Sequence, residues 1–404
     1  MRESEHGDGL GFRNVVALGL VSFFTDMSTE MILGLYPQFV VEVLGASRVA
    51  LGVSEGLAEM LSYAFRLVSG VISDRVGRRK PLVLAGYALS NLAKPFLSAA
   101  RTWVDAVAVR LVDRLGKGVR TAPRDALLSE SVESARAGVA FGVHRTLDQM
   151  GAVVGPLTAF LLLPLIGIRG VFLLSLAPGL AAVLVLAALV REGRERAPSK
   201  KYPLNFKVLA QRDFAALLAA FTLFSAGAFN FSFLLLRLGL MGVAEPLILL
   251  FYVLMNVAHT AVGIPAGYMA DRVGKEVAVA AGYGLFAAAC VACLRGSGLA
   301  GAVVASALYG AYMGFIETTQ RAAIPDYVPS KLRASGYGVY YLLVGLSSLA
   351  ANSVVGTFWD AYGYAAAFTY SLGVSCAATV AMLALAARRA VAGRALTATE
   401  GSPR

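Results

Sequence analysis

Long apolar runs, separated by short charged or turn-forming segments, dominate the pattern of hydrophobic and polar positions along the chain. A helix that crosses a bilayer needs about 20 apolar residues, and most of these runs reach that length. The pattern therefore predicts about twelve transmembrane helices. They cover residues 14–43, 49–73, 81–100, 104–128, 138–163, 170–190, 214–240, 246–270, 277–294, 298–321, 335–358 and 365–387.

The composition excludes most other classes of protein. Hydrophobic residues make up 57% of the 404 residues and charged residues only 15%, whereas soluble domains carry about 25% charged residues. A single soluble core does not grow large enough to bury so much apolar surface. An ordinary soluble enzyme, a disordered chain, a fibrous repeat and a coiled coil are therefore excluded. The sequence predicts an all-α polytopic membrane protein.

Lysine and arginine are abundant in every second predicted loop. The intervening loops carry about one each, at Arg48, Arg101, Arg169 and Arg295. Because cytoplasmic loops are enriched in these cations, both termini and the central linker are predicted to be cytoplasmic. The same bias accounts for the net charge of +11 without a nucleic-acid partner. The cation-rich loops hold Arg75, Arg78, Arg79 and Lys80, Arg136, the central linker, Arg272 and Lys275, Lys331 and Arg333, and Arg388, Arg389 and Arg394.

A repeated motif divides the chain into two similar halves. Gly70-x-x-x-Asp74-Arg75-x-Gly77 recurs as Gly267-x-x-x-Asp271-Arg272-x-Gly274, a shift of 197 positions (271 − 74). Parallel repeats of six helices are typical of transporters whose pathway lies between the halves. The predicted organisation is an N-terminal tail (1–13), a six-helix bundle (14–190), a basic linker (191–213), a second bundle (214–387) and a C-terminal tail (388–404).

These motifs resemble those of the major facilitator superfamily. The segment from Gly70 through Lys80 resembles the signature between the second and third helices of that family, and the weaker copy lies between the eighth and ninth. The resemblance implies alternating access, with a gating role for Gly70, Asp74, Arg75, Gly77, Arg78, Asp271, Arg272 and Gly274. The alternative interpretation is that the loop cations only anchor the cytoplasmic face.

A second resemblance concerns the predicted fifth helix. Gly142, Gly151, Gly155 and Pro156 resemble the antiporter signature of the drug-exporting branches of the family. The final Gly-Gly of that signature is replaced by Ala159 and Phe160. The resemblance implies a drug/proton antiporter-like exporter, and the alternative is close helix packing without a role in coupling.

Many ionisable residues lie inside the predicted helices. Such residues are costly in a bilayer and face the bundle interior or water. Asp26 and Glu30 share one helical face, and Arg110, Arg114 and Lys117 form one stripe at helical spacing. Two interpretations stay open, a structural network of ion pairs and a functional lining of a central cavity. The first half carries Asp26, Glu30, Glu59, Arg110, Asp113, Arg114, Lys117, Arg145 and Asp148 as candidate site residues.

Two mechanisms fit these charges. Asp26, Glu30 or Asp113, paired with Arg110 or Arg114, could carry a proton, or unpaired arginines could hold an anionic substrate. The second half contributes amide and aromatic side chains that suit a cavity wall. These candidates are Asn230, Asn256, Tyr312 and Tyr340.

The sequence thus predicts a monomeric multi-pass transporter of the cell membrane that exports a small organic solute in exchange for protons. The alternatives are uptake or exchange of an organic anion by the same fold, an intramembrane enzyme, or a non-transporting receptor. No cofactor, metal or catalytic residue is expected. Gly52-x-Ser54-x-Gly56 lacks the strand that a hydrolase elbow requires, Cys290-x-x-Cys293 has no second cysteine pair, and no P-loop is present.

Overall fold

The computed structural model describes residues 2–76, 78–132, 137–192, 211–329 and 332–400. Every regular element in these ranges is helical. The first half contains α1 (Arg2–Leu33), α2 (Tyr36–Gln38), η1 (Phe39–Val43), α3 (Arg48–Val76), α4 (Lys80–Ala93), η2 (Lys94–Ala99), α5 (Trp103–Glu130), α6 (Ala137–Leu174) and α7 (Leu176–Leu189). The second half contains α8 (Arg212–Gly227), α9 (Phe231–Leu240), α10 (Glu245–Val273), α11 (Lys275–Arg295), α12 (Gly298–Ala323), η5 (Ile324–Asp326), α13 (Arg333–Tyr362) and α14 (Tyr364–Glu400).

Several helices differ from their predicted bounds. α1 begins at Arg2 and α14 runs to Glu400, so helix extends into both predicted tails. The predicted helix over 214–240 is broken between Gly227 and Phe231, where Asn230 caps α9. The break predicted between residues 163 and 170 is present within α6, where Gly167 has a non-helical backbone with φ of 67° and separates two helical segments. Most of the predicted linker (193–210) lies outside the described residues.

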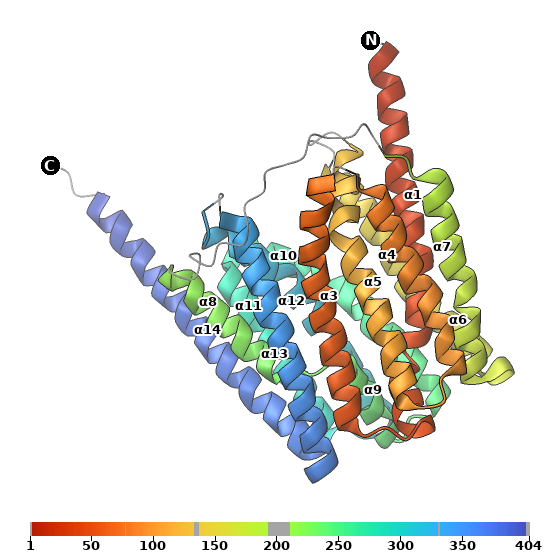
Figure 1. Cartoon of the computed structure of the whole chain (residues 1–404). Coiled ribbons are helices and arrows are strands. Elements are labelled where there is room, and N and C mark those ends of the chain that lie inside the picture. Colours follow the sequence, from red (N-terminus) through yellow and green to blue (C-terminus); the bar gives the residue numbers. More distant parts are fainter. Residues whose placement is uncertain (1, 77, 133–136, 193–210, 330–331, 401–404) are drawn as a thin grey trace.

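Eight of the described segments are long and apolar enough to cross a membrane. They do not include α3, α4 or α5, because α3 and α5 carry many charged residues and α4 is short and continues as the 3₁₀ helix η2. These helices nevertheless pack among the others in the first half (Figure 1). Their charged faces point into the protein, so hydropathy alone underestimates the number of long packed helices.

The two halves pack against each other at the end of the molecule opposite the chain termini (Figure 1). Two glycines of α3 lie directly on α13: an added Cβ at Gly56 would lie 2.6 Å from Leu349 Cα, and one at Gly52 would meet the Asn352 carbonyl. Arg48 and Asp360 form an ion pair of 3.7 Å across the same contact. We call this α3–α13 contact the seam, and the opposite end the termini end. Toward the termini end the halves diverge (Figure 1).

Candidate functional site

A cavity of about 450 Å³ lies between the two halves. Solvent reaches it from the termini end, where the side chains of Arg145 and Arg321 are 53% and 43% exposed. Of the candidate residues for substrate binding and proton coupling, all but Asp113 line the cavity. These lining residues are Asp26, Glu30, Glu59, Arg110, Arg114, Lys117, Arg145, Asp148, Asn230, Asn256, Tyr312 and Tyr340.

The cationic stripe comes from α5. A capping box between Thr102 and Asp105 starts this helix. Small residues on its other faces allow neighbouring helices to approach closely: a Cβ at Gly118 would lie 2.7 Å from the Ser62 carbonyl oxygen of α3, and one at Gly116 would lie 2.7 Å from the Gly86 carbonyl oxygen of α4. Because α3 and α4 occupy those faces, the arginines and lysine of α5 face the cavity.

Arg110 and Asp113 form the centre of a buried ion-pair network. Arg110 donates two hydrogen bonds to Glu55, at 3.2 and 2.7 Å, and contacts Asp113 at 3.5 Å. Asp113 also contacts Arg114 at 3.5 Å and accepts a 2.6 Å hydrogen bond from Ser90. The main partner of Arg110 is therefore Glu55 of α3, which the sequence analysis did not select. Asp113 is not among the residues that line the cavity, so its direct role in the pathway stays a prediction.

The acidic residues of α1 contact both halves. Asp26 and Glu30 lie on one face of the helix, as predicted, and both line the cavity. Asp148 of α6 also lines the cavity, and its charge acts on the carboxyl group of Asp26. Glu30 accepts a hydrogen bond from the hydroxyl of Tyr252, which belongs to the second half. On this face of α1, Asp26 lies beside an acid of its own half, and Glu30 contacts the opposite half.

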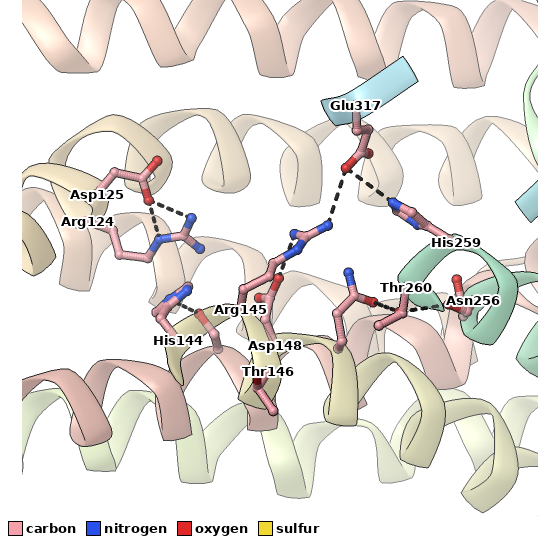
Figure 2. A network of polar contacts seen from close by, with 12 residues as sticks. Arg124, Asp125, His144, Arg145, Thr146, Asp148, Asn256, His259, Thr260 and Glu317 are labelled. Atoms are coloured by element: carbon pink, nitrogen blue, oxygen red, sulfur yellow. Dashed lines mark hydrogen bonds and ion pairs between the residues drawn. The ribbon is translucent and has the colours of Figure 1, made fainter. Parts of the chain in front are cut away.

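An ion network near the termini end spans the two halves (Figure 2). Arg145 of α6 contacts Asp148 at 3.0 Å and Glu317 of α12 at 3.3 Å. His259 of α10 and Arg321 of α12 also contact Glu317, at 3.4 and 3.6 Å. Glu317 and His259 were not selected from the sequence, although ionisable residues within apolar helices are the signal that marks such positions.

The second half lines the cavity mainly with aromatic side chains. Phe224, Phe229, Tyr309, Tyr312 and Tyr341 all face it, and the rings of Tyr309 and Tyr312 lie 5.2 Å apart in an edge-to-face arrangement. The halves therefore differ in chemistry, with a charged wall in the first and an aromatic wall in the second.

The two candidate amides have structural partners. Asn230 accepts a 2.9 Å hydrogen bond from the backbone of Ser232 and so caps α9. Asn256 donates a 3.1 Å hydrogen bond to the Ala152 carbonyl of the other half. Both line the cavity, but one hydrogen-bonding group of each amide is already used in a contact that stabilises the fold.

Lys94 was missed in the sequence analysis. Its side chain is buried, with 2% exposure, and donates hydrogen bonds to Thr29 Oγ1 and Asn91 Oδ1, both at 2.8 Å. A longer contact of 3.4 Å reaches the Thr25 carbonyl. A lysine inside a predicted apolar helix is a signal in itself, and it places a buried ammonium group between α1 and α4.

The structure describes only part of the two glycine- and arginine-containing loop motifs. Gly77 and the side chain of Asp74 lie outside the described residues. A Cβ added at Gly70 would lie 3.4 Å from the Cβ of Ala122. Arg75 and Arg78 are exposed. In the second copy, Arg272 stacks on Tyr268 at 4.2 Å, Gly274 has a positive φ of 107°, and Asp271 is exposed.

The best-defined contacts of these loops involve their other basic residues. Arg79 forms a 2.7 Å ion pair with Glu130, and Lys275 forms one of 2.8 Å with Asp326. Each of these pairs lies within one half. A gating contact across the halves stays a prediction.

The antiporter-like motif serves close packing at two of its glycines. An added Cβ at Gly155 would lie 2.6 Å from the Met27 carbonyl oxygen of α1, and one at Gly151 would meet the Phe23 carbonyl. Pro156 lies inside α6 next to these contacts. Among the described residues, no atom lies within 4 Å of a Cβ added at Gly142, so the close packing expected of the motif is not seen at this position.

Comparison with known proteins shows similarity to membrane transporters. The sequence profile of the Major Facilitator Superfamily matches residues 18–352 and, in a second match, 242–403. The chain therefore belongs to the major facilitator superfamily. It is 29% identical to an uncharacterised MFS-type transporter of Methanocaldococcus jannaschii, covering 86% of this chain and 88% of that protein. It is 27% identical to the multidrug resistance protein MdtG of Escherichia fergusonii, over 47% of this chain and 46% of that protein.

Solved structures show the same fold. A mutant of the nucleoside transporter NupG superposes with a TM-score of 0.80 at 12% identity, covering 92% of this chain and 99% of that one. A bacterial homologue of the human lysosomal transporter Spinster, in an inward-facing and unoccupied conformation, gives a TM-score of 0.69 at 17% identity, covering 98% and 99%. The chain is thus an all-α membrane protein with the fold of a secondary transporter.

Proposed function

We propose that the protein is a proton-coupled secondary active transporter that exports a small organic solute by alternating access. The observation that carries this proposal is the Asp26–Asp148 carboxyl pair within the cavity between the halves. Two neighbouring carboxylates repel each other, which favours a proton on one of them. The pair is therefore a site at which one proton binds and leaves.

The surrounding charges assign different roles to the two acids. Arg145 holds Asp148 in a 3.0 Å ion pair, which favours the ionised form of Asp148. Asp26 then carries the proton. When the cavity changes the side from which it is open, Asp26 exchanges its proton with the other compartment, and the solute moves in the same cycle.

The arrangement of the halves supports alternating access. The cavity is solvent-exposed at the termini end and closed by the seam at the other end. With cytoplasmic termini, as the loop cations predict, this conformation faces inward in the cell membrane. The cavity lies within one chain, so a monomer has a complete pathway.

The direction of transport rests on a smaller set of observations. The glycine pattern of α6 resembles that of drug-exporting branches, and MdtG, to which about half of the chain is similar, is a multidrug resistance protein. These two likenesses support export.

The proton site can be tested without knowing the solute. Spin labels at Val43 and Tyr362, which are 52% and 75% exposed at the seam end, report the separation of the halves. We expect the distance distribution of the wild type to change between acidic and alkaline buffer. Asp26→Asn should remove this pH dependence, because an amide cannot bind or release the proton.

A matched variant separates this effect from a general change of charge. Asp213→Asn alters an aspartate whose side chain is 62% exposed at the termini end, so it should leave the pH dependence unchanged. A wild-type distribution that does not respond to pH, or an Asp26→Asn protein that responds like the wild type, would reject proton coupling through this pair.

A further inference from the structure

Three cations of the cavity wall, Arg66, Lys117 and Arg120, lack an ionic partner within the described residues, and two of them lie one turn apart on α5. Arg120 is only 4% exposed, yet its Nε and Nη1 atoms have no hydrogen-bond acceptor in that part of the chain. Lys117, one turn earlier on α5, makes no ion pair there. Both residues line the cavity. Buried donors without acceptors are costly, so their presence points to an acceptor that enters the cavity.

The neighbouring acids do not fill this role. Asp26 and Glu30 of α1 act electrostatically on Lys117, but neither forms an ion pair with it among the described residues, and Glu30 accepts a hydrogen bond from Tyr252. On the same helix, Arg114 adds further positive charge and already contacts Asp113.

The other cations of the cavity have defined contacts. Arg110 pairs with Glu55, Arg124 with Asp125, and Arg145 and Arg321 with Glu317, while Arg66 packs 5.3 Å from the centre of the Tyr341 ring. Lys117, Arg120 and Arg66, whose Nε also lacks an acceptor among the described residues, therefore have free capacity for a negative charge. Of these, Lys117 and Arg120 form an adjacent pair on α5. Arg120 is also fixed in place, because its guanidinium stacks 4.4 Å from the centre of the Tyr87 ring.

The opposite wall offers a different kind of contact. Tyr312 and Tyr341 line the cavity, and among the described residues their hydroxyl groups have no hydrogen-bond partner. The Tyr341 ring stacks on Tyr63 with 5.2 Å between centroids, which holds one face of the wall rigid. Aromatic surfaces of this kind bind flat apolar groups.

We propose that the cavity binds an amphipathic organic anion, with its acidic group on Lys117 and Arg120 of α5 and its flat apolar body against the tyrosines of the second half. Carboxylate, sulfonate and phosphate share the required chemistry, since each offers several acceptor oxygens to a guanidinium and an ammonium. This inference rests on the proposed function and names the class of solute that the same cavity takes.

The test compares three fluorescent probes that share one ring system and differ in charge. These are 2-naphthoate, 2-naphthylmethanol and 2-naphthylmethylammonium, added to purified protein in neutral detergent. A ligand of the folded state raises the Tm by mass action. We expect 2-naphthoate to raise the Tm, and the neutral and cationic probes to have no comparable effect.

Single substitutions localise the acidic group. Arg120→Gln and Lys117→Gln should each weaken the apparent Kd for 2-naphthoate by about ten- to a hundredfold, the range for loss of one hydrogen bond to a charged group. Arg295→Gln, an exposed arginine at the far end of α11, should leave the Kd unchanged. Lys117→Gln keeps the test valid if Arg120→Gln does not fold, because Lys117 has no partner in the fold to lose.

Each contrary result overturns the proposal in a recognisable way. Equal stabilisation by all three probes would show that the aromatic wall acts without the cations. Stabilisation by phosphatidylglycerol with none by 2-naphthoate would assign the cations to a lipid headgroup. Because these measurements involve neither a proton gradient nor flux, their failure would leave proton coupling at Asp26 standing, and the reverse also holds.

Discussion

A single methyl group at Gly56 should shift the protein away from the conformation described above. Gly56 lies in the seam, and an added Cβ would be 2.6 Å from Leu349 Cα and 3.1 Å from the Ser348 carbonyl oxygen. Ordinary contacts of this kind begin at 3.4 Å, so the nearest one is about 0.8 Å too short. The obstructing atoms belong to the backbone of α13 and cannot rotate away, so the two helices must separate.

The size of the shift follows from the cost of overpacking. Inserting a methyl group into a tight contact costs about 1–3 kcal/mol, and this cost falls only on the state in which the seam is closed. The equilibrium should therefore move toward the opposite access state by about 5- to 150-fold. Within each half, alanine is a better helix residue than glycine, so the fold of the bundles should be retained.

Spin labels at Val43 and Tyr362 measure this shift directly, in a background in which the three native cysteines are replaced. Gly56→Ala should increase the long-distance population at the seam end. Gly284→Ala is the matched control, because no atom lies within 4 Å of its added Cβ. If Gly56→Ala and Gly284→Ala give the same distribution, the seam does not hold this end closed.

Three further outcomes test the packing and the buried charges. Arg110→Leu should lower the free energy of unfolding by about 3–5 kcal/mol, because it leaves Glu55 charged and buried. The double variant Arg110→Leu/Glu55→Gln should regain much of this stability in thermal unfolding. If it does not, the pairing of Arg110 with Glu55 is contradicted. Gly151→Val should lower the Tm, since its side chain would collide with a carbonyl of α1, whereas an unchanged Tm would exclude that contact. A maleimide should leave Cys290 and Cys293 unlabelled in the native protein, because both thiols are fully buried, and labelling of either one before denaturation would contradict the packing of α11.

Burial cost explains why much of the cavity could be predicted. An ionisable side chain in an apolar helix must avoid lipid, so the charges of α1, α5 and α6 could be placed on the interior without coordinates. Their partners could not be assigned, because pairing depends on how each helix is rotated. Arg110 contacts Asp113 on its own helix only at 3.5 Å and binds Glu55 more closely.

The break between α8 and α9 was also beyond the sequence pattern. The segment around Ala228 is flanked by apolar residues, so hydropathy does not register the interruption. Asn230 was read as a cavity residue because it is polar, although its position as the cap of α9 explains its chemistry equally well. Lys94 was overlooked because one cation hardly changes the mean hydropathy of its helix.

Lys94 has a consequence for how the protein responds to voltage. An ion pair that moves as a unit carries no net charge through an electric field, whereas the amino group of Lys94 makes its hydrogen bonds to neutral oxygens, and the acids that act on it, Asp113 and Asp26, form no ion pair with it among the described residues. Moving one elementary charge through the whole field of a membrane at 100 mV involves about 2.3 kcal/mol. Any tilting of the first half that shifts Lys94 along the membrane normal therefore makes the transport cycle electrically sensitive.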